Sequence, residues 1–282
     1  MDIQWYPGHM AKAKRMILED IATVDLLIEV IDARAPRSSR NPDLQNIRGK
    51  KAHIIVLNKS DLADKSQTEA WVKFYRGQGF YCCPLNAAQK QGTKALLATI
   101  GEATRPLQER LAARGRLPRP VRAMVVGIPN CGKSTIINAL APRGSAKTGN
   151  KPGLTRGRQW IKTTNGLELL DTPGVLWPKF ADEQTAFNLA IIGSIDENVF
   201  PIYQVAEQLA LFLALNRPQA LIDRYKLKDI PIEGQDIIEA IARSRGLLAA
   251  GGGLLTDNAA ALLLAEFKNG KFGQFTLEKA AE

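Results

Sequence analysis

The octapeptide GIPNCGKS at residues 127–134 has the spacing of a phosphate-binding loop, G-x-x-x-x-G-K-S. It lies between an apolar run typical of a buried strand and a run typical of a helix, where such a loop is expected. Backbone N–H groups would then cradle the phosphates, Lys133 would reach the β- and γ-phosphates, and Ser134 would ligate Mg²⁺. We expect nucleotide contacts from Pro129, Asn130, Cys131, Gly132, Lys133, Ser134 and Thr135.

A second motif, Asn58-Lys59-Ser60-Asp61, predicts which base is bound. The Asp61 carboxylate can accept hydrogen bonds from N1–H and from the exocyclic amine of guanine, two donors that adenine does not present in that arrangement. With adenine the carboxylate would stay unpaired, and sites built in this way discriminate by ~10⁴-fold or more. Asn58 and the stem of Lys59 would complete the base pocket. These residues predict a guanine nucleotide.

Two further segments could sense the γ-phosphate. Asp171-Thr172-Pro173-Gly174 fits D-x-x-G, in which Asp171 holds the Mg²⁺ shell through water and the N–H of Gly174 contacts the γ-phosphate. Thr155 lies between the phosphate loop and D-x-x-G, so it is a candidate for the switch threonine that closes on Mg²⁺. We therefore expect Lys133, Thr155 and Gly174 to serve hydrolysis of the nucleotide.

Short runs rich in Ile, Val and Leu place these motifs at the ends of buried parallel strands. Strands are predicted at residues 25–31, 53–57, 80–85, 123–126 and 167–170, and residues 158–163 should form a hairpin with the last of them. Helices are predicted at about residues 9–22, 66–77, 92–114 and 133–141. Asn86-Ala87 follows the third strand and resembles a small-residue loop that supports the base through backbone N–H, although an ordinary strand-end turn remains the alternative. The alternation predicts a doubly wound α/β domain over residues 1–180, with its ligand at the carboxyl ends of the strands.

The pattern after residue 180 changes to helical periodicity. Helices are predicted at about residues 183–192, 201–215, 235–245 and 257–267, and from 276 to the end. We expect residues 181–282 to form a small all-α domain.

The net charge of +10 is unevenly divided. Residues 1–180 hold 29 Lys and Arg against 14 Asp and Glu, whereas residues 181–282 hold 9 against 14. Residues 105–122 and 143–162 each carry six basic side chains. Such runs can neutralise a phosphate backbone, although a solvated face that keeps the protein soluble is an equal alternative.

Composition excludes several classes of protein. Hydrophobic content of 45% and charged content of 23% are ordinary for globular chains, and the apolar stretches are too short to span a bilayer. The three cysteines suggest neither a disulfide framework nor a metal site. The N-terminus lacks the pattern of a signal or transit peptide, so we expect a cytoplasmic protein without a membrane partner.

The order of the motifs is unusual. GTPases generally run phosphate loop, switch threonine, D-x-x-G, base motif and small-residue loop, whereas here the last two come first. This order is a circular permutation, which the site tolerates because it requires only the spatial arrangement of strand ends. We therefore predict a circularly permuted P-loop GTPase domain followed by the helical domain.

The permuted order, the start YPGHMAKA at residues 6–13, the DARAP loop at residues 32–36 and the helical tail together resemble the ribosome biogenesis GTPase A family, also called YlqF-type GTPases. The resemblance covers essentially the whole chain. It implies a GTPase that is monomeric when free, assists late maturation of the large (50S) ribosomal subunit, is stimulated by that particle and contacts rRNA. Because the tail here is acidic, we expect the first domain to make much of the phosphate contact. The candidates are Arg105, Arg114, Arg116, Arg156, Arg158, Arg224, Lys226, Lys228, Arg243 and Arg245.

Val175 occupies the position after D-x-x-G where Ras-like enzymes carry a glutamine that orients the attacking water. Its side chain can neither donate nor accept a hydrogen bond, so another group must position the water. His9 is one candidate, and a structural or RNA-facing role for it is the alternative. Asn130 resembles the asparagine that helps hold K⁺ near the phosphates in some GTPases of this class, although it could simply suit the loop backbone.

Two other functional classes compete with an rRNA assembly factor. One is a GTPase switch with a protein or membrane partner, which the basic runs disfavour. The other is a nucleotide-binding module with negligible hydrolysis, since Val175 predicts a low intrinsic turnover. Salt-sensitive co-sedimentation with large-subunit precursors tests the first of these, and turnover with and without ribosomal particles tests the second.

Overall fold

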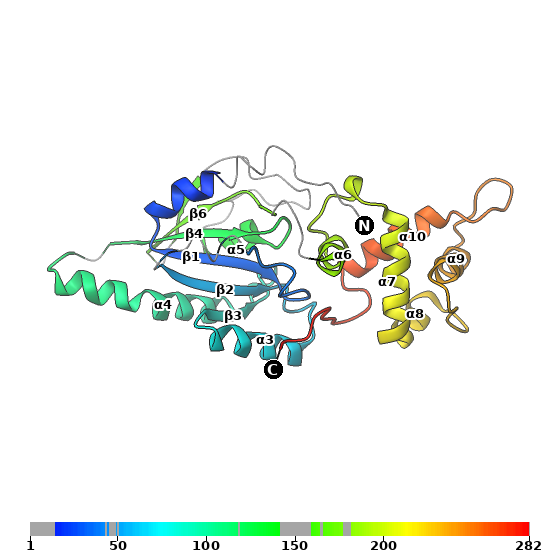
Figure 1. Cartoon of the computed structure of the whole chain (residues 1–282), viewed down its shortest axis with the longest axis horizontal. Coiled ribbons are helices and arrows are strands. Elements are labelled where there is room, and N and C mark those ends of the chain that lie inside the picture. Colours follow the sequence, from blue (N-terminus) through cyan, green and yellow to red (C-terminus); the bar gives the residue numbers. More distant parts are fainter. Residues whose placement is uncertain are drawn as a thin grey trace. The chain divides into compact units, whose positions relative to one another are not determined.

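The computed structural model describes residues 15–42, 44, 49, 51–117, 119–141, 159–163, 166–176 and 182–281, and these fall into two compact units (Figure 1). The α/β unit extends to residue 176 and also includes residues 276–281, which return to it at the end of the chain. The helical unit comprises residues 182–275. The boundary predicted at residue 180 had placed the whole end of the chain in the helical domain.

The α/β unit is built on a six-stranded sheet with the strand order β3-β2-β1-β4-β6-β5. The strands are β1 (Leu26–Asp32), β2 (Ala52–Asn58), β3 (Tyr81–Leu85), β4 (Val121–Gly127), β5 (Gln159–Lys162) and β6 (Leu167–Asp171). All neighbouring pairs are parallel except the β5–β6 hairpin. The predicted α/β sheet and its hairpin are confirmed.

Helices cover both faces of this sheet, which explains why its central strands are largely buried and mostly apolar. The helices are α3 (Lys65–Gly77), α4 (Thr93–Ala113) and α5 (Lys133–Leu140); residues 15–20 are also helical and lead into the 3₁₀ turn η1 (Ile21–Thr23). Adjacent cysteines of β3 mark the two faces. Cys82 packs with Trp71 of α3, whereas Cys83 lies beside Thr99 of α4. Burial raises the pKa of Cys83 to about 11, so this free thiol stays protonated.

The chain changes direction across the sheet between β1 and β4. From β1 it steps outward to β2 and β3, and from β4 it steps the other way to β6. Ligands of doubly wound sheets bind beyond the strand ends at such a reversal. The loops that follow β1 and β4 therefore border the expected site.

The helical unit packs five helices around a core of aliphatic side chains that includes Leu209, Leu213, Ile241 and Leu263. The helices are α6 (Glu183–Ile191), α7 (Ile202–Asn216), α8 (Pro218–Tyr225), α9 (Gly234–Ser244) and α10 (Thr256–Lys268), with the 3₁₀ turn η2 (Glu197–Val199) before α7. Four of them were predicted. The eight-residue α8, which begins at a proline that suits the first helical turn, was missed. None of the described helices combines the length and apolar character needed to cross a membrane.

The helix predicted from residue 276 is wrong. Residues 276–281 have no regular secondary structure, and their backbone instead bonds to the α/β unit. The N–H of Leu277 donates to the carbonyl of Arg34 at 2.7 Å, and the Glu278 carbonyl accepts from Trp71 Nε1 at 3.0 Å. These backbone groups are therefore satisfied outside a helix.

Candidate nucleotide-binding site

The phosphate loop connects β4 to α5, as its motif requires, and its backbone is unusual at Asn130 (φ 57°) and Gly132 (φ 96°). Asparagine tolerates this left-handed conformation, so Asn130 suits the loop. Gly132 has a steric reason as well. A Cβ at this position would lie 2.2 Å from Nδ2 of Asn58, so glycine allows the base motif to approach the phosphate loop.

The ammonium of Lys133 lies within the curve of the loop. Lys133 is only 7% exposed, and its Nζ donates to the carbonyls of Gly127 at 3.2 Å and Ile128 at 2.8 Å. These two bonds hold a positive charge where a phosphate-binding loop needs one. The neighbouring Cys131 thiol is buried, and burial raises its pKa, so it contributes no competing negative charge.

Asn58, at the end of β2, joins the two loops for which the sequence predicts nucleotide contacts. Its Nδ2 donates to the carbonyl of Cys131 at 2.8 Å, and its Oδ1 accepts from the N–H of Ala87 at 3.1 Å. Asn58 is 2% exposed. A buried amide that serves both loops keeps the base motif, the small-residue loop and the phosphate loop in register. The sequence had placed Asn58 in the base pocket, and the structure shows what it connects.

Asp32, the last residue of β1, fixes the lysine of the base motif. Lys59 has a positive φ of 57°, and its Nζ lies 2.9 Å from Oδ2 of Asp32. Arg34 donates to the same carboxylate from its backbone N–H at 3.0 Å and from its guanidinium at 2.8–2.9 Å. Burial raises the pKa of Asp32, but the charges of Arg34 and Lys59 outweigh burial and hold the pKa well below its usual range.

Asp32 and Arg34 belong to the DARAP segment that carries the family resemblance, and neither was predicted from the sequence as a site residue. The available signal was a carboxylate at the carboxyl end of a fully buried strand, beside the strand that carries the base motif. Asp61 of that motif is solvent-exposed, and Ser60 donates its N–H to the carbonyl of Leu85 at 3.2 Å. Asn86 pairs with Gln91 in a short bridge, which shapes the loop next to Ala87.

Oxygen ligands suited to Mg²⁺ meet at the ends of β4 and β6. The Ser134 hydroxyl donates to Oδ2 of Asp171 at 3.2 Å, and Asp171 is 2% exposed. One hydroxyl and one carboxylate fit a hard cation that also takes phosphate and water oxygens. Within the described residues, no group of three His, Cys, Asp or Glu side chains could hold a metal by itself. The Ser134 hydroxyl and the Asp171 carboxylate are donors that fit a magnesium ion bound together with a nucleotide.

Gly174 and Val175 attach the D-x-x-G segment to the phosphate loop. A Cβ on Gly174 would lie 2.7 Å from Cα of Pro129, and the N–H of Val175 donates to the carbonyl of Gly127 at 3.2 Å. The Val175 side chain is 4% exposed and packs in a core cluster with Ile17 and other apolar residues. This valine is therefore part of the core, in addition to lacking a hydrogen-bonding group.

Four predicted residues, His9, Thr155, Arg156 and Arg158, lie outside the described residues. The candidate RNA contacts that are described differ in their surroundings. Arg105, Arg114 and Arg116 are exposed on and just after α4, and Lys226 and Lys228 are exposed after α8. Arg224 and Arg245 pair with Glu266, and Arg243 pairs with Glu239.

Known proteins match the chain along its whole length. It is 44% identical to ribosome biogenesis GTPase A of Priestia megaterium over 100% of this chain and 98% of the relative, and 34% identical to that of Thermotoga maritima over 98% and 94%. The crystal structure of GNP-bound YlqF from T. maritima has a TM-score of 0.68 and 29% identity, covering 96% of this chain and 99% of that chain.

A family model described as "50S ribosome-binding GTPase" matches residues 122–230. That match begins with the strand before the phosphate loop and leaves the base motif at residues 58–61 outside it, as a permuted order requires. Full-length relatives, a full-length structural match and this model agree. The chain belongs to the ribosome biogenesis GTPase A family.

Proposed function

We propose that this protein is a cytoplasmic GTPase, monomeric when free, that acts late in maturation of the large (50S) ribosomal subunit and contacts its rRNA. GTP hydrolysis follows from family membership. The main support for a guanine-nucleotide site is the pair of hydrogen bonds made by Asn58. They join the base motif to both the phosphate loop and Ala87. The relatives named for ribosome biogenesis support the particle as the partner.

Each side chain of the site then has a role. Lys133 would bind the β- and γ-phosphates, and Asp61 would accept the two donors of guanine. Ser134 would ligate Mg²⁺ and Asp171 would hold its water shell, with Thr155 closing on the ion. Bound Mg²⁺ would neutralise the charge that develops on the phosphates. The N–H of Gly174 would contact the γ-phosphate.

The buried side chain of Val175 leaves the positioning of the attacking water to another group. We propose His9 for this role, and K⁺ held with the help of Asn130 as a source of positive charge. His9→Ala should lower particle-stimulated turnover and leave GDP affinity unchanged. Turnover in K⁺ should exceed turnover in Na⁺. Equal turnover in K⁺ and in Na⁺ would reject the role proposed for K⁺. Unchanged turnover in His9→Ala would reject the role proposed for His9.

The nucleotide state would also set the orientation of the helical unit. Val175 bonds to Gly127 of the phosphate loop, and the chain enters the helical unit at residue 182, only seven residues later. A change at the γ-phosphate would therefore act directly on the connection. Distances measured between spin labels on the two units should differ between GDP and a non-hydrolysable GTP analogue. Identical distances, both free and particle-bound, would refute this switch.

Depletion of the protein from cells tests the proposed function most directly. Large-subunit precursors should accumulate, and the purified protein should sediment with them in a salt-sensitive manner because it binds rRNA phosphates. Added precursors should raise GTP turnover. Normal ribosome profiles after depletion, or turnover indifferent to the particles, would reject the proposal in favour of another partner.

A further inference from the structure

The last described residues of the chain form a strap across the α/β unit. This segment, residues 276–281, follows directly on the helical unit and runs beside α3, where it is drawn in red in Figure 1. Thr276 Oγ1 accepts a hydrogen bond from the N–H of Asp64 at 3.0 Å, and Ala280 packs against the core cluster that contains Trp71. The strap is therefore anchored along its length by polar and apolar contacts.

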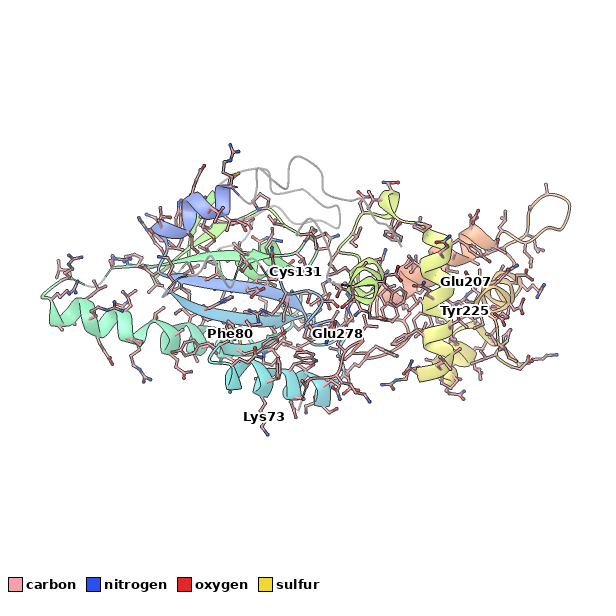
Figure 2. All side chains as sticks on the ribbon, in the orientation of Figure 1. Lys73, Phe80, Cys131, Glu207, Tyr225 and Glu278 are labelled. Carbon is pink, nitrogen blue, oxygen red and sulfur yellow. The ribbon has the colours of Figure 1, made fainter. Side chains whose placement is uncertain are left out.

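Glu278 is the centre of the strap. Its carboxylate accepts hydrogen bonds from the N–H of Arg37 at 2.6 Å and of Ser38 at 3.0 Å, and also from the Ser38 hydroxyl. Glu278 is 7% exposed, and Figure 2 shows it beside the carboxyl ends of β1 and β2. A buried carboxylate requires such donors, and here two of them are backbone groups of one loop. Glu278 thus fixes the course of the loop that follows β1.

That loop holds the lysine of the base motif in place. Arg34, whose carbonyl accepts from Leu277 of the strap, donates to the Asp32 carboxylate that pairs with Lys59. The hydroxyl of Ser39 donates to the carbonyl of Ala35 at 2.6 Å and accepts from the N–H of Asp32 at 3.1 Å, which closes the loop on itself. Movement of the loop would therefore move the carboxylate on which Lys59 rests.

The strap also reaches the other side of the base motif. Asp64, which bonds to Thr276, lies three residues after Asp61 and caps α3 by accepting from the N–H groups of Ser66 and Gln67. The guanine-binding segment from Asn58 to Asp61 is consequently flanked by two strap contacts. One acts through Arg34 and Asp32, and the other through Asp64.

We propose that the strap is a positioning element for guanine, with Glu278 as its main positioning residue, so that the base site depends on the far end of the chain. The proposal rests on the assignment of residues 58–61 to the base. It predicts that loss of the strap weakens contacts to the base and spares contacts to the phosphates.

The test compares Glu278→Ala with the matched control Lys279→Ala, whose side chain is exposed on the same strap. Affinities are measured for GDP, for IDP, which lacks the exocyclic amine, and for tripolyphosphate, which lacks a base. Glu278→Ala should weaken GDP binding by about tenfold, lower the preference for GDP over IDP, and leave tripolyphosphate binding within about twofold. Lys279→Ala should match the wild type in all three.

Further variants keep the test decisive. Glu278→Gln, which retains one accepting oxygen, should fall between the wild type and Glu278→Ala, and a chain that ends at Phe275 should lose at least as much as Glu278→Ala. Ser38→Ala should combine non-additively with Glu278→Ala because the two side chains interact directly. Thermal unfolding identifies any variant that does not fold.

The outcomes separate the strap from the base motif. Asp61→Ala should lose GDP affinity if residues 58–61 bind the base. If Asp61→Ala loses affinity and folded Glu278 variants keep wild-type affinity and base preference, the strap proposal is overturned and the base motif stands. If Asp61→Ala binds GDP normally, both assignments fail. An equal loss of tripolyphosphate binding in Glu278→Ala would show a general structural role and would also overturn the proposal.

Discussion

Polar side chains serve different ends in the two units. In the α/β unit, Asn58, Asp32 and Asp171 are buried at the carboxyl ends of strands and bond to loops that would bind a nucleotide. In the helical unit, the Glu266 carboxylate instead forms ion pairs with Arg224 and Arg245. These pairs connect α10 to α8 and to the end of α9. The first arrangement positions groups for a ligand, whereas the second holds helices together. Substitutions in the two units should therefore affect different properties.

The largest effect should come from Gly132→Ala. The added methyl would lie 2.2 Å from Nδ2 of Asn58, on a backbone whose φ of 96° already disfavours alanine. We expect GDP affinity to fall by about 100-fold or more, since both the phosphate loop and the base motif must move. Titration with a fluorescent GDP analogue measures it. Gly101→Ala, in α4 and clear of other atoms, is the matched control.

Glu266→Gln should lower stability and leave GDP affinity unchanged, the opposite of what is expected for Gly132→Ala. Glu266 is 8% exposed and its carboxylate accepts from Arg224 Nε at 2.9 Å, so the amide would leave a guanidinium donor poorly paired. We expect the helical unit to lose about 1–3 kcal/mol of stability, while GDP affinity stays unchanged. Hydrogen exchange of α8 and α10 amides in the whole protein reports the loss. A fall in GDP affinity as large as that from Gly132→Ala would contradict the division between the units.

The pH dependence of stability tests the ion pair between Arg224 and Glu266. The hydrogen bond from Arg224 lowers the pKa of Glu266, so its contribution to stability is complete above the unfolded pKa of about 4.3 and is lost as pH falls through the folded pKa. The stability difference between wild type and Glu266→Gln should therefore shrink below about pH 4. A difference that stays constant to pH 2 would mean that packing, and not charge, holds Glu266 in place.

Two arginine pairs with the same spacing test whether the two units differ in the RNA contacts that we propose. Arg114 and Arg116 are exposed, and neither makes an ion pair within the described part of the chain, whereas Arg243 and Arg245 are paired with carboxylates. Arg114→Gln/Arg116→Gln should lower affinity for single-stranded RNA and reduce the slope of log K against log salt by about 1.4. Arg243→Gln/Arg245→Gln should reduce the same slope by less than about half of that amount. Equal reductions of the slope in the two double variants would mean that the two arginine pairs do not differ in RNA binding.

The α/β unit could be predicted closely because its signals are local. Apolar strands end in motifs whose chemistry depends on short spacings, as in residues 58–61 and 127–134. The strap could not be predicted, since Glu278 bonds to Ser38 across 240 residues and no local pattern encodes that contact. Lys59 presents the same difficulty, because its partner Asp32 lies on a neighbouring strand. The segment from Thr276 to the end looked helical for the same reason, because its partners, such as Arg34 and Trp71, lie more than 200 residues earlier in the chain.

The smallest effect should come from Gly101→Ala itself. Gly101 is exposed within α4, and a Cβ there would meet no atom within 4 Å, so alanine fits without strain. Because glycine has more backbone freedom to lose in a helix, the substitution should stabilise the α/β unit by about 0.5–1 kcal/mol. Urea unfolding followed by fluorescence, with Trp71 buried in this unit, measures it. GDP affinity should remain within about twofold of wild type, because α4 carries none of the proposed nucleotide contacts. A larger change would mean that the site is sensitive to the stability of its whole unit, and the 100-fold loss expected of Gly132→Ala could then no longer be assigned to its contact with Asn58.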